Sequence, residues 1–559
     1  MQFCHGIVAR DQLKGIKITD MPVFRKPWFW ITAAIVVTVF AMTNLPYLFA
    51  ANAAGQGTVF GGFLLNPLDG NSYLAKMYQG WRGDWRFTLP YTAQPGKGGY
   101  LFLFYLFLGH LARWLHQPLL LVFHLFRILG TGGMLFALCS FFKATLVEDR
   151  LSVPAFALAA LGSGLGWLLL PFGAFTSDYW VAETYPFLSA YGNPHFVIGL
   201  ALLLWILTQQ VRSRYLAAKG KLLVTLAALG LSIISPFGVV IALVVSGIAT
   251  LLDFWPIRSG KRRSLTDFWE LAWSQTFFWV LIGGAPLSIY DFWIARVDPV
   301  LAGWNLQNLT PAPPLWDTVV SLSPALLLAL VGIWALYKNH DQSLTSGQRL
   351  LLIWALAGLL LLYAPFGLQR RFMMGLYIPM AGLAVIGLMG LAARIRKRMS
   401  FLFTIVLLLA LPTNLLVLLA AQHGAQTHDP QIYLTRGEAL ALDWIEVNTS
   451  PNALILASPQ TGLLIPAYTG RRVIYGHPFE TVNAEVQKNL VVQWFGEGKT
   501  PKSASQADQQ PQKILEEQQV DYIFMGPREQ ALGGLPGGLR LAEIYNLKGV
   551  KIFAVLQGH

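Results

Sequence analysis

Apolar runs of about 20 residues recur along most of this chain, and they restrict its fold more than any other feature of the sequence. Residues 28–50, 119–142 and 401–420 are three of them. A helix of about 20 apolar residues crosses the ~30 Å hydrocarbon layer of a membrane, where the backbone must satisfy its own hydrogen bonds. The runs therefore predict a polytopic α-helical membrane protein.

The charges fit a membrane protein better than a nucleic-acid-binding one. Only 12% of the 559 residues are charged, whereas soluble domains have roughly 25%. The net charge of +13 comes largely from short basic clusters beside apolar runs, which is the pattern of loops that stay in the cytoplasm. We therefore expect membrane lipids, and no nucleic acid, among the partners. The two cysteines, Cys4 and Cys139, lack metal-ligand spacing.

The basic clusters also orient the chain. Residues 1–27 are basic and are expected to form a cytoplasmic tail, followed by an uncleaved first span, because the next apolar run exceeds the ~7–15 residues of a signal-peptide core. The transmembrane domain is predicted over 28–420. Its polar loops, at 51–97, 172–193 and 291–316, are expected outside the cytoplasm.

The number of spans is open between two values. If every apolar segment crossed, the charges downstream of residue 195 would lie on the wrong sides. Either segment 98–116, which contains His110 and Arg113, does not cross, or segment 119–142 is split at Gly130–Gly133. We expect about 11 or 13 spans.

The composition changes after residue 420, where polar and charged residues return. Residues 421–559 are therefore predicted to form a small soluble α/β domain outside the cytoplasm. Helices are expected at 438–447 and 512–519, and strands at 453–457, 472–475, 521–525, 540–546 and 550–556. The loop cluster 476–480 could reach a cleft that faces the membrane, although turn chemistry alone also explains its glycine and proline.

The first outward loop carries the most suggestive acidic residue, Asp69, at the start of an expected interfacial helix that also contains Tyr73. Two interpretations are open. A carboxylate there can be an N-cap that satisfies free backbone amides, or it can perform chemistry.

The order Asp69, Tyr73, Ala75 and Gly80, in an outward loop after a first span, resembles polytopic glycosyltransferases of the GT-C class, which use polyprenyl-phosphate-linked sugars. The resemblance implies a GT-C-like membrane domain, and inverting transfer to a hydroxyl of an extracytoplasmic glycan, lipid or protein. It also implies that Asp69 is the general base or holds the acceptor. Bacterial relatives suggest a bacterial plasma membrane. Relatives often have two adjacent acidic residues, whereas Gly70 follows here, so a divalent metal stays open.

The same resemblance implies a second acidic loop, for which Asp178 and Glu183 are the candidates. Asp178 is the second candidate catalytic residue, and Glu183 and His195 are candidates for substrate binding. The alternatives are helix caps, an interfacial aromatic belt and a hydrogen-bonded interfacial histidine.

Arg370 and Arg371 lie between two apolar runs on the expected outward side, where topology disfavours positive charge. Guanidinium groups suit phosphate, so a lipid-linked donor phosphate is the predicted ligand. Phospholipid headgroups or snorkelling would explain the pair equally well. Tyr73 and Arg82 of the first loop are further substrate-binding candidates, with a solvated face as the alternative for Arg82.

Two other functions are open: a lipid-linked saccharide translocator or export component, and a non-catalytic accessory subunit. A translocation pathway would place charges within the spans, but the carboxylates gather in the outward loops. There is also no G-x-x-x-x-G-K-[ST] phosphate loop. Both observations favour surface chemistry driven by the sugar-phosphate bond.

Overall fold

The computed structural model describes residues 27–254, 264–338, 343–499 and 509–556, so that the predicted cytoplasmic tail lies outside the described residues except for Pro27. Seven helical segments within these ranges are long and apolar enough to cross a membrane. They are α1 (Pro27–Ala53), α4 (Leu119–Leu146), α7 (Pro194–Arg212), α9 (Pro236–Phe254), α11 (Thr276–Val297), α16 (Tyr377–Arg394), and α17 (Met399–Ala410) continued by α18 (Pro412–Gln426). The protein is an integral membrane protein.

Shorter helices complete the bundle. An eighth span results if α13 (Leu315–Leu322) and α14 (Ala325–Lys338), bent by 82°, count as one. The others are α3 (Leu103–Leu115), α5 (Asp149–Leu161), α8 (Ala218–Ile234), α10 (Leu265–Ser274) and α15 (Ser346–Leu362). The total of 11 or 13 spans stays a prediction.

The two open repairs of the topology have different outcomes. Helix α3 has 13 residues, so it rises only about 20 Å and cannot cross a ~30 Å layer as a straight helix. Helix α4 runs without a break through Gly130–Gly133, so the expected split is wrong there. The predicted loop 291–316 is also largely helical, because α11 continues to Val297 and α12 (Pro299–Gln307) follows.

The described chain after α18, which we call the α/β segment, contains a five-stranded sheet in the order β4-β3-β5-β7-β6. Strands β3 (Leu454–Leu456), β4 (Arg472–Val473) and β5 (Tyr522–Met525) are parallel, and β6 (Leu541–Leu547) and β7 (Val550–Val555) are antiparallel. Five helices accompany the strands: α19 (Arg436–Asn448), α20 (Pro459–Thr469), α21 (Ala484–Gly496), α22 (Gln509–Glu517) and α23 (Pro527–Leu532). The strands expected from the sequence are therefore present.

Strand β3 lies in the apolar run 453–457, and both of its faces are covered. Ile455 packs into one cluster, with side chains of α19 and α20. Leu454 and Leu456 pack into another, with side chains of α21 and α22. A strand covered on both faces needs apolar residues at every position, and alternation disappears.

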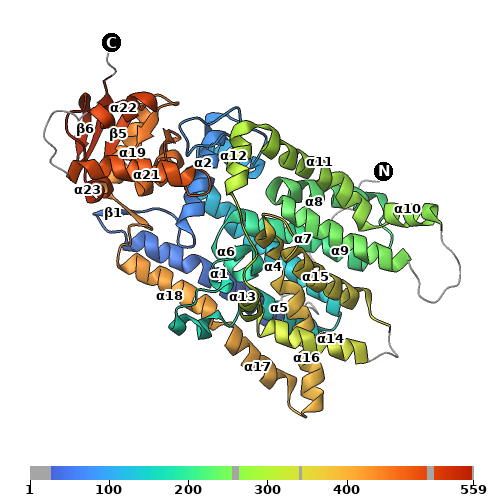
Figure 1. Cartoon of the computed structure of the whole chain (residues 1–559). Coiled ribbons are helices and arrows are strands. Elements are labelled where there is room, and N and C mark those ends of the chain that lie inside the picture. The colour runs from blue at the N-terminus through green and yellow to red at the C-terminus, as the bar shows by residue number, and fades with distance from the viewer. Residues whose placement is uncertain (1–26, 255–263, 339–342, 500–508, 557–559) are drawn as a thin grey trace, which may run out of the picture.

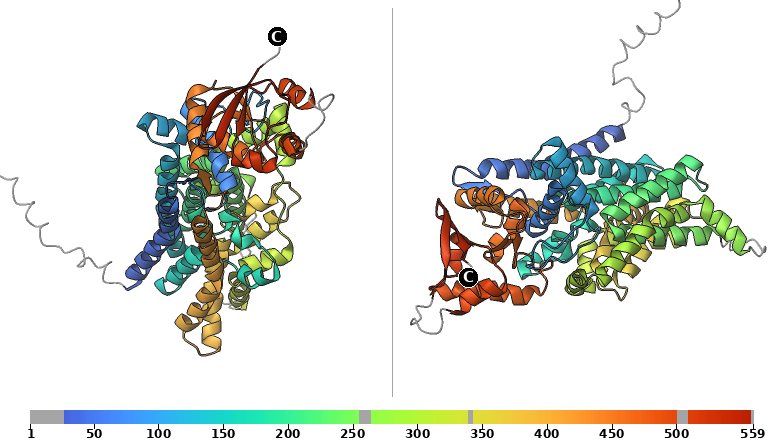
Figure 2. Two further views of the ribbon diagram at one scale, coloured as in Figure 1. Left: turned by 90° about the vertical axis from the view of Figure 1, so that its left-hand side faces the viewer. Right: turned by 90° about the horizontal axis from the view of Figure 1, so that it is seen from above.

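The sheet is joined to the first loop at one end of the helix bundle (Figures 1 and 2). Strand β1 (Thr58–Phe60), which follows α1, pairs antiparallel with β2 (Tyr433–Thr435), which follows α18. Helices α1 and α18 lie side by side, and α2 (Pro67–Arg82) packs against α20. The first loop is thus held between the membrane helices and the α/β segment.

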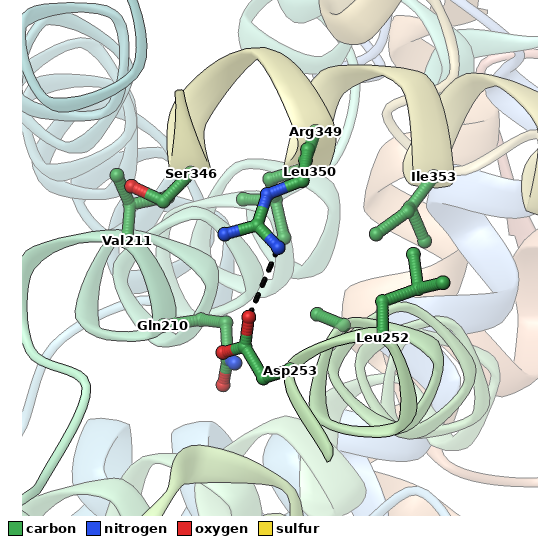
Figure 3. A pocket seen from close by; sticks show the side chains of 9 residues that line it. Gln210, Val211, Leu252, Asp253, Ser346, Arg349, Leu350 and Ile353 are labelled. Atoms are coloured by element: carbon green, nitrogen blue, oxygen red, sulfur yellow. Dashed lines mark hydrogen bonds and ion pairs between the residues drawn. The ribbon is translucent and has the colours of Figure 1, made fainter. Parts of the chain in front are cut away.

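The C-terminal ends of α7 and α9 and the N-terminal end of α15 meet around a small cavity with polar and apolar lining residues (Figure 3). Arg349 of α15 is ion-paired with Asp253 of α9 at 3.0 Å, and Gln210 of α7 lines the same cavity. Its volume of about 20 Å³ is that of one water site. The ion pair therefore joins α15 to α9, and the cavity beside it is too small for more than a water molecule.

Candidate active site

Helix α2 presents Asp69 from its first turn. The N-cap of α2 is Asn66, whose φ is +49° and whose side-chain amide donates to Asp69 Oδ2 at 2.6 Å. The interpretation of Asp69 as the N-cap is therefore wrong. Its side chain is 35% exposed, so that a substrate can reach the carboxylate.

Aromatic residues form one wall beside Asp69. Tyr73 lies one helical turn further along α2 and stacks on Tyr105 of α3, with ring centres 4.3 Å apart. His195, at the start of α7, meets the Tyr73 ring edge-on at 4.9 Å, and its Nδ1 is 2.6 Å from the Tyr105 hydroxyl. The structure therefore brings the predicted residues Tyr73 and His195 together.

The predicted arginine pair lies on η6 (Gln369–Met373), which is held against the chain segment before α13. The Gln369 side chain accepts from Ala312 N, and Arg370 N donates to Thr310 O at 3.0 Å. The Arg370 guanidinium lies 4.5 Å from the centre of the Trp180 ring. These contacts fix the backbone from which both arginines project.

Arg371 and Glu183 of η5 (Ala182–Thr184) form an ion pair at 3.5 Å. Burial lowers the pKa of Arg371, but the carboxylates of Glu183 and Asp69 together with Tyr73 outweigh it and raise the pKa overall. The pKa of Tyr73 is also raised, in this case mainly by burial. The negative charges of Asp69, Glu480 and Glu183 raise it further, and the positive charge of Arg371 opposes them. These groups, although far apart in sequence, surround one phenol.

The 476–480 cluster reaches this region. Lys76 of α2 is fully buried, and its Nζ lies 2.6 Å from Glu480 Oε1. Ser72 Oγ donates to the same oxygen at 2.6 Å. Burial raises the pKa of Glu480, but Lys76 and His477 outweigh it, so the pKa lies below its usual value. A buried ion pair therefore joins the α/β segment to the helix that carries Asp69.

His477 of the same loop also lies against α2, although it is not among the site residues predicted from the sequence. The side chain is 3% exposed, and its Nε2 lies 3.9 Å from Asp69 Oδ1. The sequence indicated that the loop 476–480 could reach a cleft, but it did not indicate the proximity of His477 to Asp69, because that depends on how the loop meets α2.

Asp178 is placed differently from Asp69. It is fully buried on η4 (Ser177–Tyr179) and accepts hydrogen bonds from Thr176 Oγ1 at 2.6 Å, Thr413 Oγ1 at 2.9 Å and Gly166 N at 3.0 Å. A side chain at Gly166 would collide with this carboxylate at 2.2 Å. The groups around Tyr73 are not among these partners, so the position of Asp178 argues for a brace between loops and against the catalytic role expected from the sequence.

Replacement of Asp178 by Asn tests this assignment. The amide would turn an N–H toward one of the surrounding donors, and an opposed buried donor costs about 1–3 kcal/mol. We expect a lower unfolding temperature and an unchanged transfer rate per folded molecule. Thermal unfolding of the purified protein, with turnover measured on the folded fraction, checks both. A large loss of rate at unchanged stability would return Asp178 to the active site.

Arg82 also departs from expectation. It lies at the other end of α2, about 20 Å from Asp69 by helical rise. Its Nη1 donates to the carbonyls of Pro451 and Gly470 at 2.9 and 3.1 Å. Arg82 ties α2 to the α/β segment, and its position does not support the predicted contact with substrate.

Asp69 stands beside a cleft of about 330 Å³ between the first loop and the α/β segment. Its lining includes Leu68 and Pro478, the neighbours of Asp69 and His477, and further Phe63, Asn71, Gln460 and Tyr475. Arg528 also lines the cleft, but its charge is paired with Glu438 at 2.8 Å. The remaining aromatic, aliphatic and amide side chains suit a neutral organic ligand. Among the described residues, no group of three or more His, Cys, Asp or Glu side chains is arranged to hold a metal ion.

Comparison with known proteins gives relatives by structure alone. No family model and no curated protein sequence matches this chain. The oligosaccharyltransferase AglB from Archaeoglobus fulgidus, solved with an inhibitory peptide and a dolichol-phosphate, superposes with a TM-score of 0.52 at 14% identity, over 89% of this chain and 69% of that one. A second oligosaccharyltransferase structure from Archaeoglobus fulgidus, in complex with Zn and sulfate, gives a TM-score of 0.52 at 14% identity, over 88% of this chain and 67% of that one.

A structure from a different organism aligns with nearly the whole chain. ArnT from Cupriavidus metallidurans, bound to undecaprenyl phosphate, gives a TM-score of 0.49 at 11% identity over 94% of this chain and 98% of that one. The two oligosaccharyltransferase superpositions show a shared fold. The resemblance to the GT-C class is thereby confirmed at the level of the fold.

Proposed function

We propose that this membrane protein, which has the fold of GT-C glycosyltransferases, transfers a sugar from a polyprenyl-phosphate donor to an extracytoplasmic hydroxyl with inversion. The observation that carries the proposal is that Asp69, an accessible carboxylate, and Arg371, a cation paired with Glu183, both interact electrostatically with Tyr73. A base and a phosphate-binding cation are the two groups that this reaction requires.

Asp69 takes the proton of the acceptor hydroxyl as its oxygen attacks the anomeric carbon. The bond from that carbon to the phosphate oxygen breaks, and the phosphate leaves with the bonding electron pair. Attack on the face opposite to the leaving group inverts the configuration. A phosphate leaving group is a stable anion and needs no proton, so a single carboxylate suffices.

Arg371 stabilises the departing phosphate, with Arg370 beside it. A fixed guanidinium close to the charge that develops lowers the barrier without reorganisation. The AglB structure contains a dolichol-phosphate, which supports a polyprenyl phosphate as the carrier. The cleft beside Leu68 and Pro478 is the proposed entry for the acceptor, which can be a glycan, a lipid or a protein.

Orientation follows from the helix directions. Helix α7 begins at the site beside His195 and ends at Arg212, and α16 begins just after η6 and ends at Arg394. Both helices therefore end in basic residues away from the site. Because basic ends favour the cytoplasm, we place the site and residues 421–559 outside it.

Arg371→Ala is expected to raise the KM for the donor about 10- to 100-fold, since hydrogen bonds to charged groups are worth about 1.5–3 kcal/mol. Arg370→Ala should act in the same direction. Arg82→Ala serves as the matched control and should leave the donor KM unchanged. Initial rates at varied donor concentration, with the acceptor saturating, give all three values. Equal donor KM values in the wild type and the Arg371 variant would remove Arg371 from the donor site.

The function itself is tested with the purified protein in vesicles and a panel of polyprenyl-phosphate sugars. We expect at least one donor to yield both a glycosylated acceptor and free polyprenyl phosphate. A translocator would instead move the lipid between leaflets without releasing the free phosphate. Movement without release would overturn the proposal.

A further inference from the structure

The loop that carries His477 is ordered by its own hydrogen bonds. Thr481 Oγ1 accepts from the backbone N–H groups of Gly476 and His477 at 3.4 and 3.3 Å, and Thr481 N donates to His477 O at 3.0 Å. Gly476 packs against Gly462 so closely that a side chain at Gly476 would lie 2.3 Å from the Gly462 carbonyl oxygen. The loop therefore holds the imidazole in one place against α2.

The hydrogen bonding of His477 determines which nitrogen carries the proton. Its Nδ1 accepts from Phe479 N–H at 3.1 Å, so the neutral ring carries hydrogen on Nε2. Burial lowers the pKa of His477, and Glu480 and Asp69 oppose this while Lys76 adds to it. The overall lowering keeps the ring neutral and Nε2 a donor.

This donor is buried without a partner. Within the described part of the chain, His477 Nε2 has no hydrogen-bond acceptor. Asp69 Oδ1 stands 3.9 Å from it, which is beyond hydrogen-bond range but within reach of a small side-chain rotation. The second oxygen of Asp69 already accepts from Asn66. A bond from Nε2 would thus fix both oxygens of the carboxylate.

We propose that His477 orients Asp69 for catalysis by donating Nε2–H to its Oδ1 after a small side-chain rotation, so that the α/β segment supplies a positioning residue to the base. The inference rests on the proposed function of Asp69. His477 acts through Asp69 and exchanges no proton with the substrate.

Other charged groups act on the same place and must stay constant in any test. Tyr73 of α2, Tyr105 of α3, and Arg370 and Arg371 of η6 all interact electrostatically with Asp69. Glu480 and Lys76 act on His477 from the loop and from α2. A test that alters His477 alone leaves these charges in place.

Replacing His477 by asparagine and by glutamine, whose amide groups reach different distances, provides a matched pair of variants. His477→Asn keeps an acceptor near the Nδ1 position for Phe479 N–H but loses the reach to Asp69. His477→Gln places an amide N–H near the Nε2 position. His428, whose Nε2 contacts the Ala53 carbonyl at 2.8 Å, provides the control variant His428→Asn elsewhere in the chain.

The measurement is the pH profile of kcat in the vesicle assay. A carboxylate that accepts a hydrogen bond is easier to keep ionised, so His477→Asn should move the acidic limb of the profile upward by about one pH unit. His477→Gln should restore the wild-type limb, and His428→Asn should leave it in place. A uniform loss of rate at every pH, unrescued by Gln, would show a purely structural role and overturn the inference.

The two proposals fail separately. If the wild-type protein transfers no sugar from any donor of the panel, the proposed function fails. If it transfers sugar and the acidic limb of His477→Asn coincides with that of the wild type, only the role of His477 fails. Thermal unfolding of each variant identifies the folded fraction on which the rates are calculated.

Discussion

Asp69→Asn is expected to lower kcat for sugar transfer by about 10²–10⁴-fold, the usual contribution of a positioned base. Asparagine has nearly the same shape, and its side-chain oxygen can still accept from Asn66, but it cannot take the acceptor proton. Because the carboxylate is about one-third exposed, the change should cost little stability. The measurement is kcat at saturating donor and acceptor in vesicles, with thermal unfolding of the same sample.

Asp84→Asn is the matched control for this variant. Asp84 follows the same helix, and its side chain is 53% exposed beside Arg82 at 3.7 Å. We expect the wild-type rate from it. A fully active Asp69→Asn protein would show that another group takes the proton, and the assignment of the site would then be wrong.

Lys76→Met should destabilise the α/β segment by about 3–5 kcal/mol, because it leaves the Glu480 carboxylate buried without its cation. Lys76 is fully buried and Glu480 is 11% exposed in its side chain, with 2.6 Å between their charged atoms. Methionine keeps most of the length and the apolar contacts. Denaturant unfolding of the full chain, followed by the fluorescence of Trp494 and the other tryptophans, measures the change.

Two comparisons isolate the charge effect. The double variant Lys76→Met with Glu480→Gln should recover part of the loss, since replacing both partners of a buried pair removes the uncompensated charge. Lys513→Met breaks an exposed pair with Glu517, whose side chains are 72% and 58% exposed, and should change stability by less than about 1 kcal/mol. Equal effects from Lys76→Met and Lys513→Met would contradict the role given to the buried pair.

Several elements were predictable because one physical requirement dominates them. Apolar runs must become helices in a membrane, and the run Ala453–Ala457 had to be covered on both faces, which led to β3. The position of Asp69 at the start of a helix was also predicted, and it lies in the first turn of α2 with an accessible side chain. Whether it acts as the base stays a prediction until the variant is measured.

Other features depend on contacts that no local pattern contains. Lys76 and Glu480 are 404 positions apart, and each alone resembles an ordinary loop charge. Asp178 and Asp69 look alike in sequence, since both precede aromatic residues in polar loops. They differ in the number of protein donors that surround them, and that number is set by helices from distant parts of the chain.

The pairing of β1 with β2 joins the loop that carries Asp69 to the α/β segment, so the two depend on each other structurally. The two strands follow the first and the last membrane helices, and the contact between them continues through Lys76 and Glu480. A chimera that exchanged only residues 427–559 with a relative would replace β2 and Glu480 but keep their partners β1 and Lys76. Exchanging residues 54–86 together with them would keep the two strands and the two charged side chains from one protein, so the two segments must be exchanged together if both contacts are to be kept.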